Sequence, residues 1–186
     1  MDADRLARLE LLLDRQDILD CLGHFSRGMD RFDRDLFLSA FHPDATIAAG
    51  PFVGDPKALY EWARPMHEQG QVATHHNLLN HSCEISGDTA HTETYYLFVG
   101  RNRDESNWIA GGRYIDRLER RDGVWRIALR TNVIEWSGLA PTLPLPFADV
   151  PDLHGNGAPG RGKDDPSYRR PLVNLRDEQI PPGLED

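Results

Sequence analysis

Three histidines stand within seven positions in the segment THHNLLNH, residues 74–81. Imidazole changes its charge near physiological pH, so a histidine can take a proton from a substrate, bind a metal ion or form part of a polar surface. His75 and His76 are neighbours, and neighbouring side chains of a strand point to opposite faces of the sheet. A zinc or iron site needs about three converging ligands, which this spacing does not provide. The segment therefore favours a proton-transfer base over a metal site.

Composition and motifs exclude several other classes of protein. The chain has 186 residues and a formal net charge of -9, whereas nucleic-acid binders concentrate positive charge. Neither a long apolar run nor an apolar leader is present, so we expect no membrane span and a cytoplasmic location. No glycine-rich nucleotide loop and no serine at a strand-turn-helix elbow are found. We expect no metal and no cofactor.

The elements that would position the histidines begin with helices. Apolar residues recur at steps of three and four over residues 4–29, which predicts an amphipathic helix. A second, short helix is expected at residues 34–41. The segment ATIAAG, residues 45–50, then reads as a first strand. We expect Asp55 to cap a third helix and Pro65 to kink or end it.

Beyond Gln71 the apolar period changes to two, which is typical of strands. We expect four strands at residues 72–85, 89–103, 108–120 and 124–136, because the segments between them, SGDT, DESN and RRDG, have turn chemistry. Helices followed by an antiparallel meander predict an α+β fold. The helices would cover the concave face of a curved antiparallel sheet and leave a conical pocket between the layers.

The end of the chain differs in composition from the rest. From Gly138 onward it holds nine of the 13 prolines and few large apolar residues, so it cannot form a core of its own. We therefore divide the chain into a folded domain, residues 1–138, and a C-terminal arm, residues 139–186. Two states stay open for the arm: a disordered tail, or an extended segment lying on its own domain or on a neighbouring copy.

Several stretches of residues 1 to about 138 carry a family resemblance: DRQDI, FSRGMDRFDRD, PFVGDPKAL, HHNLLN and GGRYIDRLERRDGVWRI. They resemble the SnoaL-like branch of the NTF2-like cone fold, and within it the group of scytalone dehydratase and hexachlorocyclohexane dehydrochlorinase. Lyases of that group use an aspartate and a histidine as a catalytic pair. The resemblance implies these roles for Asp30, in MDRFD, and for His76, because His76 and Asn80 reproduce the family's H-x-x-x-N spacing.

Such a pair is chemically sensible. A carboxylate at one ring nitrogen fixes the tautomer, orients the other nitrogen toward substrate and stabilises the imidazolium that forms. General-base assistance of this kind is typically worth ~10²- to 10⁴-fold in rate. The alternatives are a hydrogen-bonded pocket or surface histidine at His76, and a helix-end carboxylate beside arginines at Asp30.

An unbroken strand register places even-numbered side chains on the same face as His76. Arg130 is then interior, where it could bind a phenolate or carboxylate or assist a leaving oxygen; pairing with an internal carboxylate or facing solvent are the alternatives. Tyr96 could donate to a leaving hydroxyl or be an ordinary core residue. The other substrate-binding candidates on this face are Asn80, Phe98, Tyr114, Asn132 and Trp136.

The resemblance implies a cofactor-independent lyase that acts on a small aromatic hydrophobic molecule, with His76 as base and Asp30 as its orienter. Elimination of water or halide is one version. Retro-aldol release of formaldehyde from a lignin-derived diarylpropane diol is another. An isomerase and a noncatalytic binding module stay open, since fold does not dictate reaction. The resemblance also implies a homodimer or homotrimer.

Overall fold

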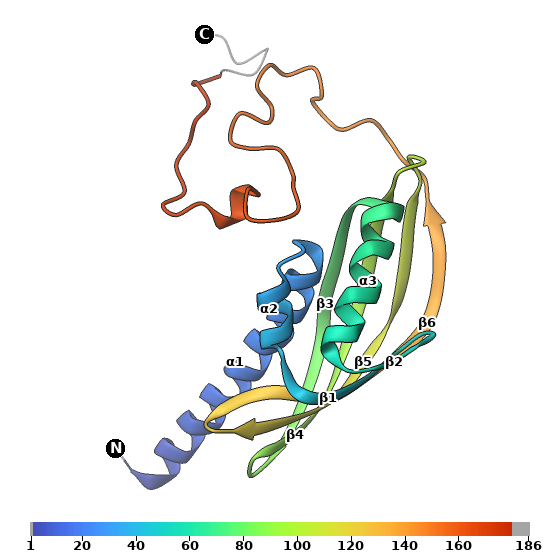
Figure 1. Cartoon of the computed structure of the whole chain (residues 1–186). Helices are drawn as coiled ribbons and strands as arrows, with labels where there is room; N and C mark the ends of the chain where they lie inside the picture. The colour runs from blue at the N-terminus through green and yellow to red at the C-terminus, as the bar shows by residue number, and fades with distance from the viewer. Residues whose placement is uncertain (1, 180–186) are drawn as a thin grey trace.

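The computed structural model describes residues 2–179, in which three helices lie along one face of a curved six-stranded sheet (Figure 1). The helices are α1 (Ala3–Asp30), α2 (Arg34–Ser39) and α3 (Pro56–Gly70). The strands are β1 (Phe41–Ala49), β2 (Phe52–Gly54), β3 (Gln71–Ser86), β4 (Thr89–Asn102), β5 (Asn107–Arg121) and β6 (Val124–Ala140). One 3-10 turn, Pro166–Tyr168, lies in the C-terminal segment. The predicted α+β class is confirmed.

The sheet has the strand order β2-β1-β6-β5-β4-β3. Strands β3 to β6 form the predicted antiparallel meander, in which each strand pairs with the next one in the chain. β1 departs from the expected all-antiparallel sheet because it runs parallel to β6, with Ile47 opposite Arg130. The sheet is therefore mixed. Parallel partners are distant in the chain, and no turn motif marks their pairing in the sequence.

Helix α1 is longer than the surface it packs on. Its second half buries Ile18, Leu22, Phe25 and Met29, but the leucines of its first half are exposed. A helix of this length spans ~42 Å, and its first turns extend away from the sheet (Figure 1). The predicted helix is confirmed, but the apolar residues of its first half do not reach the core. In the described part of the chain, no helix is long and apolar enough to cross a membrane.

Helix α3 begins as predicted and continues past Pro65 to Gly70. Asp55 caps it by accepting a hydrogen bond from the backbone N–H of Ala58, at 2.9 Å. Of the two effects expected of Pro65, a kink or an end of the helix, the helix does not end there. The buried face that includes Ala63 continues past the proline to His67, and this packing outweighs the helix-breaking tendency of one proline. The extra turn brings His67 to the sheet.

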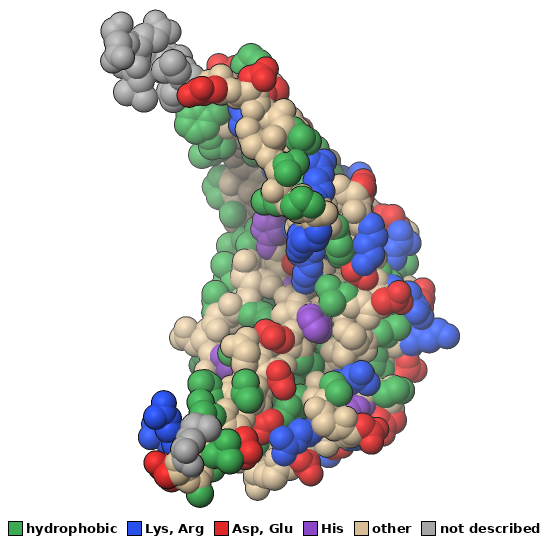
Figure 2. All heavy atoms as spheres, turned by 90° about the vertical axis from the view of Figure 1, so that its left-hand side faces the viewer, with side chains coloured by type: hydrophobic (Ala, Val, Ile, Leu, Met, Phe, Trp, Pro, Cys, Tyr) green, Lys and Arg blue, Asp and Glu red, His purple; other side chains and the backbone are tan. Residues whose placement is uncertain are grey.

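The C-terminal segment returns to its own domain at the end of α1. The backbone N–H of Gly162 donates to the carbonyl of Arg31 at 2.7 Å, and the Tyr168 hydroxyl donates to Asp33 Oδ2 at 2.8 Å. Lys163 pairs with the same Asp33 carboxylate. In Figure 2, Lys and Arg side chains gather where this segment meets the domain. Of the two predicted states, the described residues adopt the one in which the arm lies on its own domain.

Candidate active site

The structure brings Asp30 and His76 into direct contact. Asp30 is the last residue of α1, and His76 lies six residues into β3. Asp30 Oδ1 lies 2.6 Å from His76 Nδ1, and Asp30 Oδ2 accepts a hydrogen bond from the backbone N–H of His76 at 2.9 Å. Both side chains are nearly buried, with 13% and 10% of their surface exposed. The carboxylate thus holds the histidine by its ring and by its main chain.

The pair has a defined charge state on the carboxylate side. Burial by itself raises the pKa of Asp30, but the hydrogen bonds and charge of His76 outweigh burial, so this pKa lies below its ordinary value. Asp30 is therefore ionised at neutral pH and can only accept hydrogen bonds. It follows that Nδ1 of His76 carries a proton, which leaves the lone pair of the neutral ring on Nε2.

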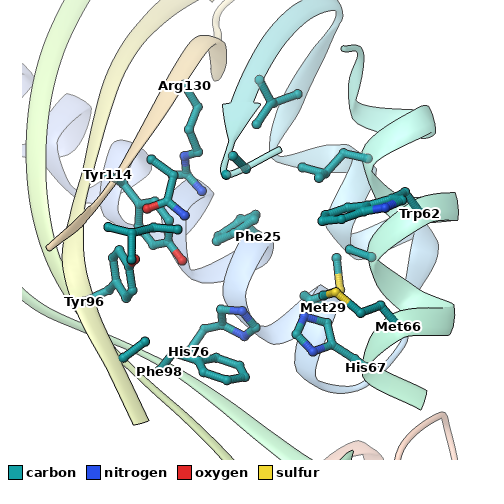
Figure 3. Close-up of a pocket in the computed structure, with 18 of the residues that line it drawn as sticks. Phe25, Met29, Trp62, Met66, His67, His76, Tyr96, Phe98, Tyr114 and Arg130 are labelled. Carbon is teal, nitrogen blue, oxygen red and sulfur yellow. The ribbon is translucent and has the colours of Figure 1, made fainter. Parts of the chain in front are cut away.

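His76 borders a pocket of about 300 Å³ between the helices and the sheet (Figure 3). The His76 ring lies edge-on to Phe98, with ring centroids 4.9 Å apart. The Phe25 ring also makes an edge-to-face contact with His76, with centroids 6.1 Å apart. Most other wall residues are apolar or aromatic, among them Met29, Leu59, Trp62, Met66, Trp108 and Ile134. Such a lining and volume suit a small aromatic molecule.

Arg130 lies at the end of the pocket opposite His76 (Figure 3), and its side chain is almost completely buried. Its Nε and Nη2 each donate to an oxygen of Asp116 at 2.7 Å, so pairing with an internal carboxylate is what the structure shows. Its guanidinium also lies over the rings of Phe25 and Tyr114, at 4.1 and 4.2 Å. Among the described residues, nothing accepts a hydrogen bond from its third nitrogen, Nη1.

Tyr96, Tyr114, Phe98 and Asn132 line the pocket, as the register predicted. The two tyrosine rings are stacked with centroids 4.5 Å apart, and burial raises the pKa of both hydroxyls, which therefore keep their protons. Asn132 Oδ1 is buried without a hydrogen-bond partner in the described residues. Together with Arg130, these groups make one end of the pocket polar.

Asn80 does not face the pocket, contrary to prediction. The pairing of β3 with β4 shifts register between Leu78 and His81, and a one-residue shift turns the following side chains to the other face. His81 then points inward, where its Nδ1 lies 2.8 Å from Thr94 Oγ1, while Asn80 is exposed.

Trp136 is also outside the pocket. The pairing of β5 with β6 changes register by one residue at this point, because Gly112 is opposite Ile134 but Gly111 is opposite Trp136. The indole lies across Gly111 and is 49% exposed, while Ile134 lines the pocket. Alternation of side chains alone does not reveal either shift.

Two residues of the site were not predicted. His67, on α3, lines the pocket, and its ring lies edge-on to His76 with centroids 5.7 Å apart. Burial, followed by the nearby charge of His76, lowers the pKa of His67 to about 4, so this ring is neutral at pH 7. Continuing the helical period of α3 past Pro65 would have identified it. Asp116 is opposite Arg130 in the β5–β6 pairing, and continuing the even-numbered alternation from Tyr114 to the next position would have identified it.

Within residues 2–179, no three His, Cys, Asp or Glu side chains are close enough together to hold a metal ion. The site therefore consists of the Asp30–His76 pair and a second histidine at one end, aromatic walls, and hydroxyl and guanidinium donors at the other end (Figure 3).

In a comparison with protein families, the model of the SnoaL-like domain matches residues 10–131. A search of curated protein sequences found no match.

Solved structures with the same fold share about a fifth of their residues with this chain. A hexachlorocyclohexane dehydrochlorinase from Novosphingobium barchaimii has 19% identity and a TM-score of 0.67, covering 73% of this chain and 96% of its own. A candidate scytalone dehydratase from Novosphingobium aromaticivorans has 18% identity and a TM-score of 0.63, covering 71% and 91%. A protein of unknown function from Mycobacterium tuberculosis has 21% identity and a TM-score of 0.60, covering 67% and 77%. At this identity the likeness establishes the fold.

Proposed function

The chain belongs to the SnoaL-like domain family, and from this premise we propose that it is a cofactor-independent lyase acting on a small aromatic hydrophobic molecule. His76 is the base in this proposal, and Asp30 orients it. The observation that carries the proposal is the two-point hold of Asp30 on the ring and the backbone of His76, at the wall of an aromatic pocket. A binding module has no need of a histidine fixed in one tautomer.

In the proposed reaction, His76 Nε2 takes a proton from the substrate, and Asp30 stabilises the resulting imidazolium. In an elimination, the electrons of the broken C–H bond form a double bond, and the leaving group takes the electron pair of the broken C–O or C–halogen bond. Halide departs as the anion, whereas a leaving hydroxyl takes a proton from the Tyr96 hydroxyl and departs as water. In a retro-aldol cleavage, the proton comes from a hydroxyl, formaldehyde leaves, and the electrons of the broken C–C bond remain on the substrate. Both versions build negative charge away from His76.

The polar end of the pocket is suited to that charge. Arg130 Nη1 lacks a partner among the described residues, and a buried donor without a partner is costly. A phenolate, ether or leaving oxygen of the substrate would satisfy it. The protonated hydroxyls of Tyr96 and Tyr114 are further donors on the same wall.

A substitution with a neighbouring control tests the proposal. Purified protein would be screened on aromatic alcohols, diols and halides for release of water, formaldehyde or halide. His76→Ala should lower turnover by ~10²- to 10⁴-fold and leave the fold intact. His75→Ala should match the wild type, because this side chain is exposed on the neighbouring position of β3.

Two results would contradict a lyase. Full turnover by His76→Ala would remove the base from the mechanism. Tight binding of aromatic molecules without conversion of any would instead make the chain a noncatalytic binding module.

We also propose that copies of the chain associate as a homodimer or homotrimer. Leu6, Leu9, Leu12 and Leu13, in the first half of α1, are 40% to 63% exposed. Apolar patches of this kind in folded proteins are typical of contact surfaces. Another copy of the chain would cover them.

A further inference from the structure

A chain of hydrogen bonds runs from the protein surface to His67, and the donor and acceptor of every bond in it are fixed by the carboxylate at its outer end. It starts at Asp104, whose pKa is lowered by hydrogen bonds from the side chain and backbone of Ser106, so the carboxylate is ionised and only accepts. The Ser106 hydroxyl therefore donates to Asp104 Oδ1, at 2.6 Å. Because the hydroxyl hydrogen of Ser106 is already donated to Asp104, Ser106 Oγ can only accept from Asn102, whose Nδ2 donates to it at 2.9 Å.

The same direction continues inward. With its amide nitrogen committed to Ser106, Asn102 presents Oδ1 to Gln71 Nε2, at 3.2 Å. Gln71 then presents its own oxygen, Oε1, to His67 Nδ1 at 3.0 Å. An amide oxygen carries no hydrogen and cannot donate, so the proton of this bond belongs to Nδ1 of His67. The neutral ring consequently carries its lone pair on Nε2.

Nε2 of His67 has no hydrogen-bond partner among the described residues, and the ring lines the pocket beside His76 (Figure 3). The pocket thus holds a second imidazole beside His76, and the neutral His67 ring presents an accepting Nε2 there. A lone acceptor in an apolar pocket gains most from a ligand that brings a proton donor. An alcohol hydroxyl is such a donor, whereas a carbon-bound halogen has no proton to give.

We propose that His67 accepts a hydrogen bond from a hydroxyl of the substrate, and that the site therefore selects alcohols or diols over organohalides. The inference rests on the proposed function and narrows its substrate class. His76 removes the proton that starts the reaction, while His67 holds a hydroxyl and so fixes which hydrogen faces His76. His67 acts here as a specificity-determining residue.

The tautomer itself is the first test and needs no substitution. Long-range ¹H–¹⁵N correlation spectra of ¹⁵N-labelled protein distinguish Nδ1–H from Nε2–H imidazole. At pH 7 we expect His67 as a single Nδ1–H tautomer, while the exposed His75 serves as an internal reference for an unconstrained ring. A proton on Nε2 of His67 would overturn the inference.

Binding of two probes of similar shape, 2-phenylethanol and 2-phenylethyl chloride, is the second test. Wild-type protein should bind the alcohol more tightly than the chloride. The His67→Phe substitution should weaken binding of the alcohol by about tenfold and leave binding of the chloride unchanged. Equal affinities in the wild type, or equal losses for both probes in the variant, would refute selection by His67. Because only binding is measured, the result is independent of turnover, so failure of the lyase proposal and failure of this inference can be told apart.

Discussion

At the residue scale, the two oxygens of Asp30 have separate roles. One orients the ring of His76 and the other anchors its backbone, so the position and the tautomer of the base are set by one carboxylate. A carboxylate at the C-terminal end of a helix is electrostatically unfavourable, and the bonds to His76 offset this cost.

Asp30→Asn tests whether the charge matters in addition to the geometry. The amide keeps an oxygen that can accept a hydrogen bond, but it no longer stabilises a charged imidazole. We expect kcat to fall by roughly 10²-fold or more, with KM nearly unchanged, in steady-state kinetics on a substrate from the screen. An unchanged kcat would show that Asp30 only supports the fold.

His67 predicts a specific loss of stability in acid. Its pKa is 6.5 in the unfolded chain and about 4 in the folded protein, so between these values the unfolded state binds more protons. The free energy of unfolding is therefore unaffected by this group above pH 6.5. It decreases as the pH falls toward 4, by at most about 3 kcal/mol, because the unfolded chain takes up a proton that the folded protein does not. Urea unfolding at pH 7, 5 and 4 measures it.

His67→Gln is the matched variant for this effect. It should be less sensitive to acid than the wild type across the same window, since glutamine does not titrate. Equal acid sensitivity of the two proteins would contradict burial of a neutral His67.

At the element scale, much of the architecture was predictable. Helical and strand periodicities predicted α1, the third helix and all four strands of the meander, because each element carries its own local pattern. The two register shifts were not predictable, since a shift depends on the pairing of two strands rather than on either sequence alone. That is why Arg130 and Tyr96 face the pocket as expected while Asn80 and Trp136 do not.

Gly111 marks the shift on β5 and provides a prediction at this scale. A Cβ at this position would lie 2.4 Å from the indole of Trp136, so Gly111→Ala should force the ring away. We expect a loss of ~1–3 kcal/mol in chemical unfolding. Gly138→Ala is the control, because a Cβ there meets nothing within 4 Å. Similar stabilities of the two variants would contradict the packing of Trp136 on Gly111.

At the scale of the whole molecule, the C-terminal segment is attached to the part of the domain that holds Asp30. Arg161 Nη1 donates to the carbonyl of His67 at 3.0 Å, and Tyr168 bonds to Asp33, three residues after Asp30. Composition predicted an arm without a core of its own, but not its location, because these contacts join residues more than 90 positions apart.

Truncation after Ala140, the end of β6, should therefore affect the site as well as stability. We expect a lower melting temperature and weaker binding of 2-phenylethanol, since the contacts at Asp33 and His67 are lost. Calorimetry and titration measure these two effects, and light scattering on both proteins measures the mass. A truncated chain with unchanged melting and affinity would show that the arm has no such role.

Chemical rescue of His76→Ala tests the central claim most directly. The substitution removes the ring that would act as base and leaves space beside Asp30 for a free imidazole. We predict that turnover is lost and then restored in part by added imidazole, in proportion to its neutral form. Turnover that survives the substitution, or that added imidazole does not restore, would contradict the assignment of His76 as the base.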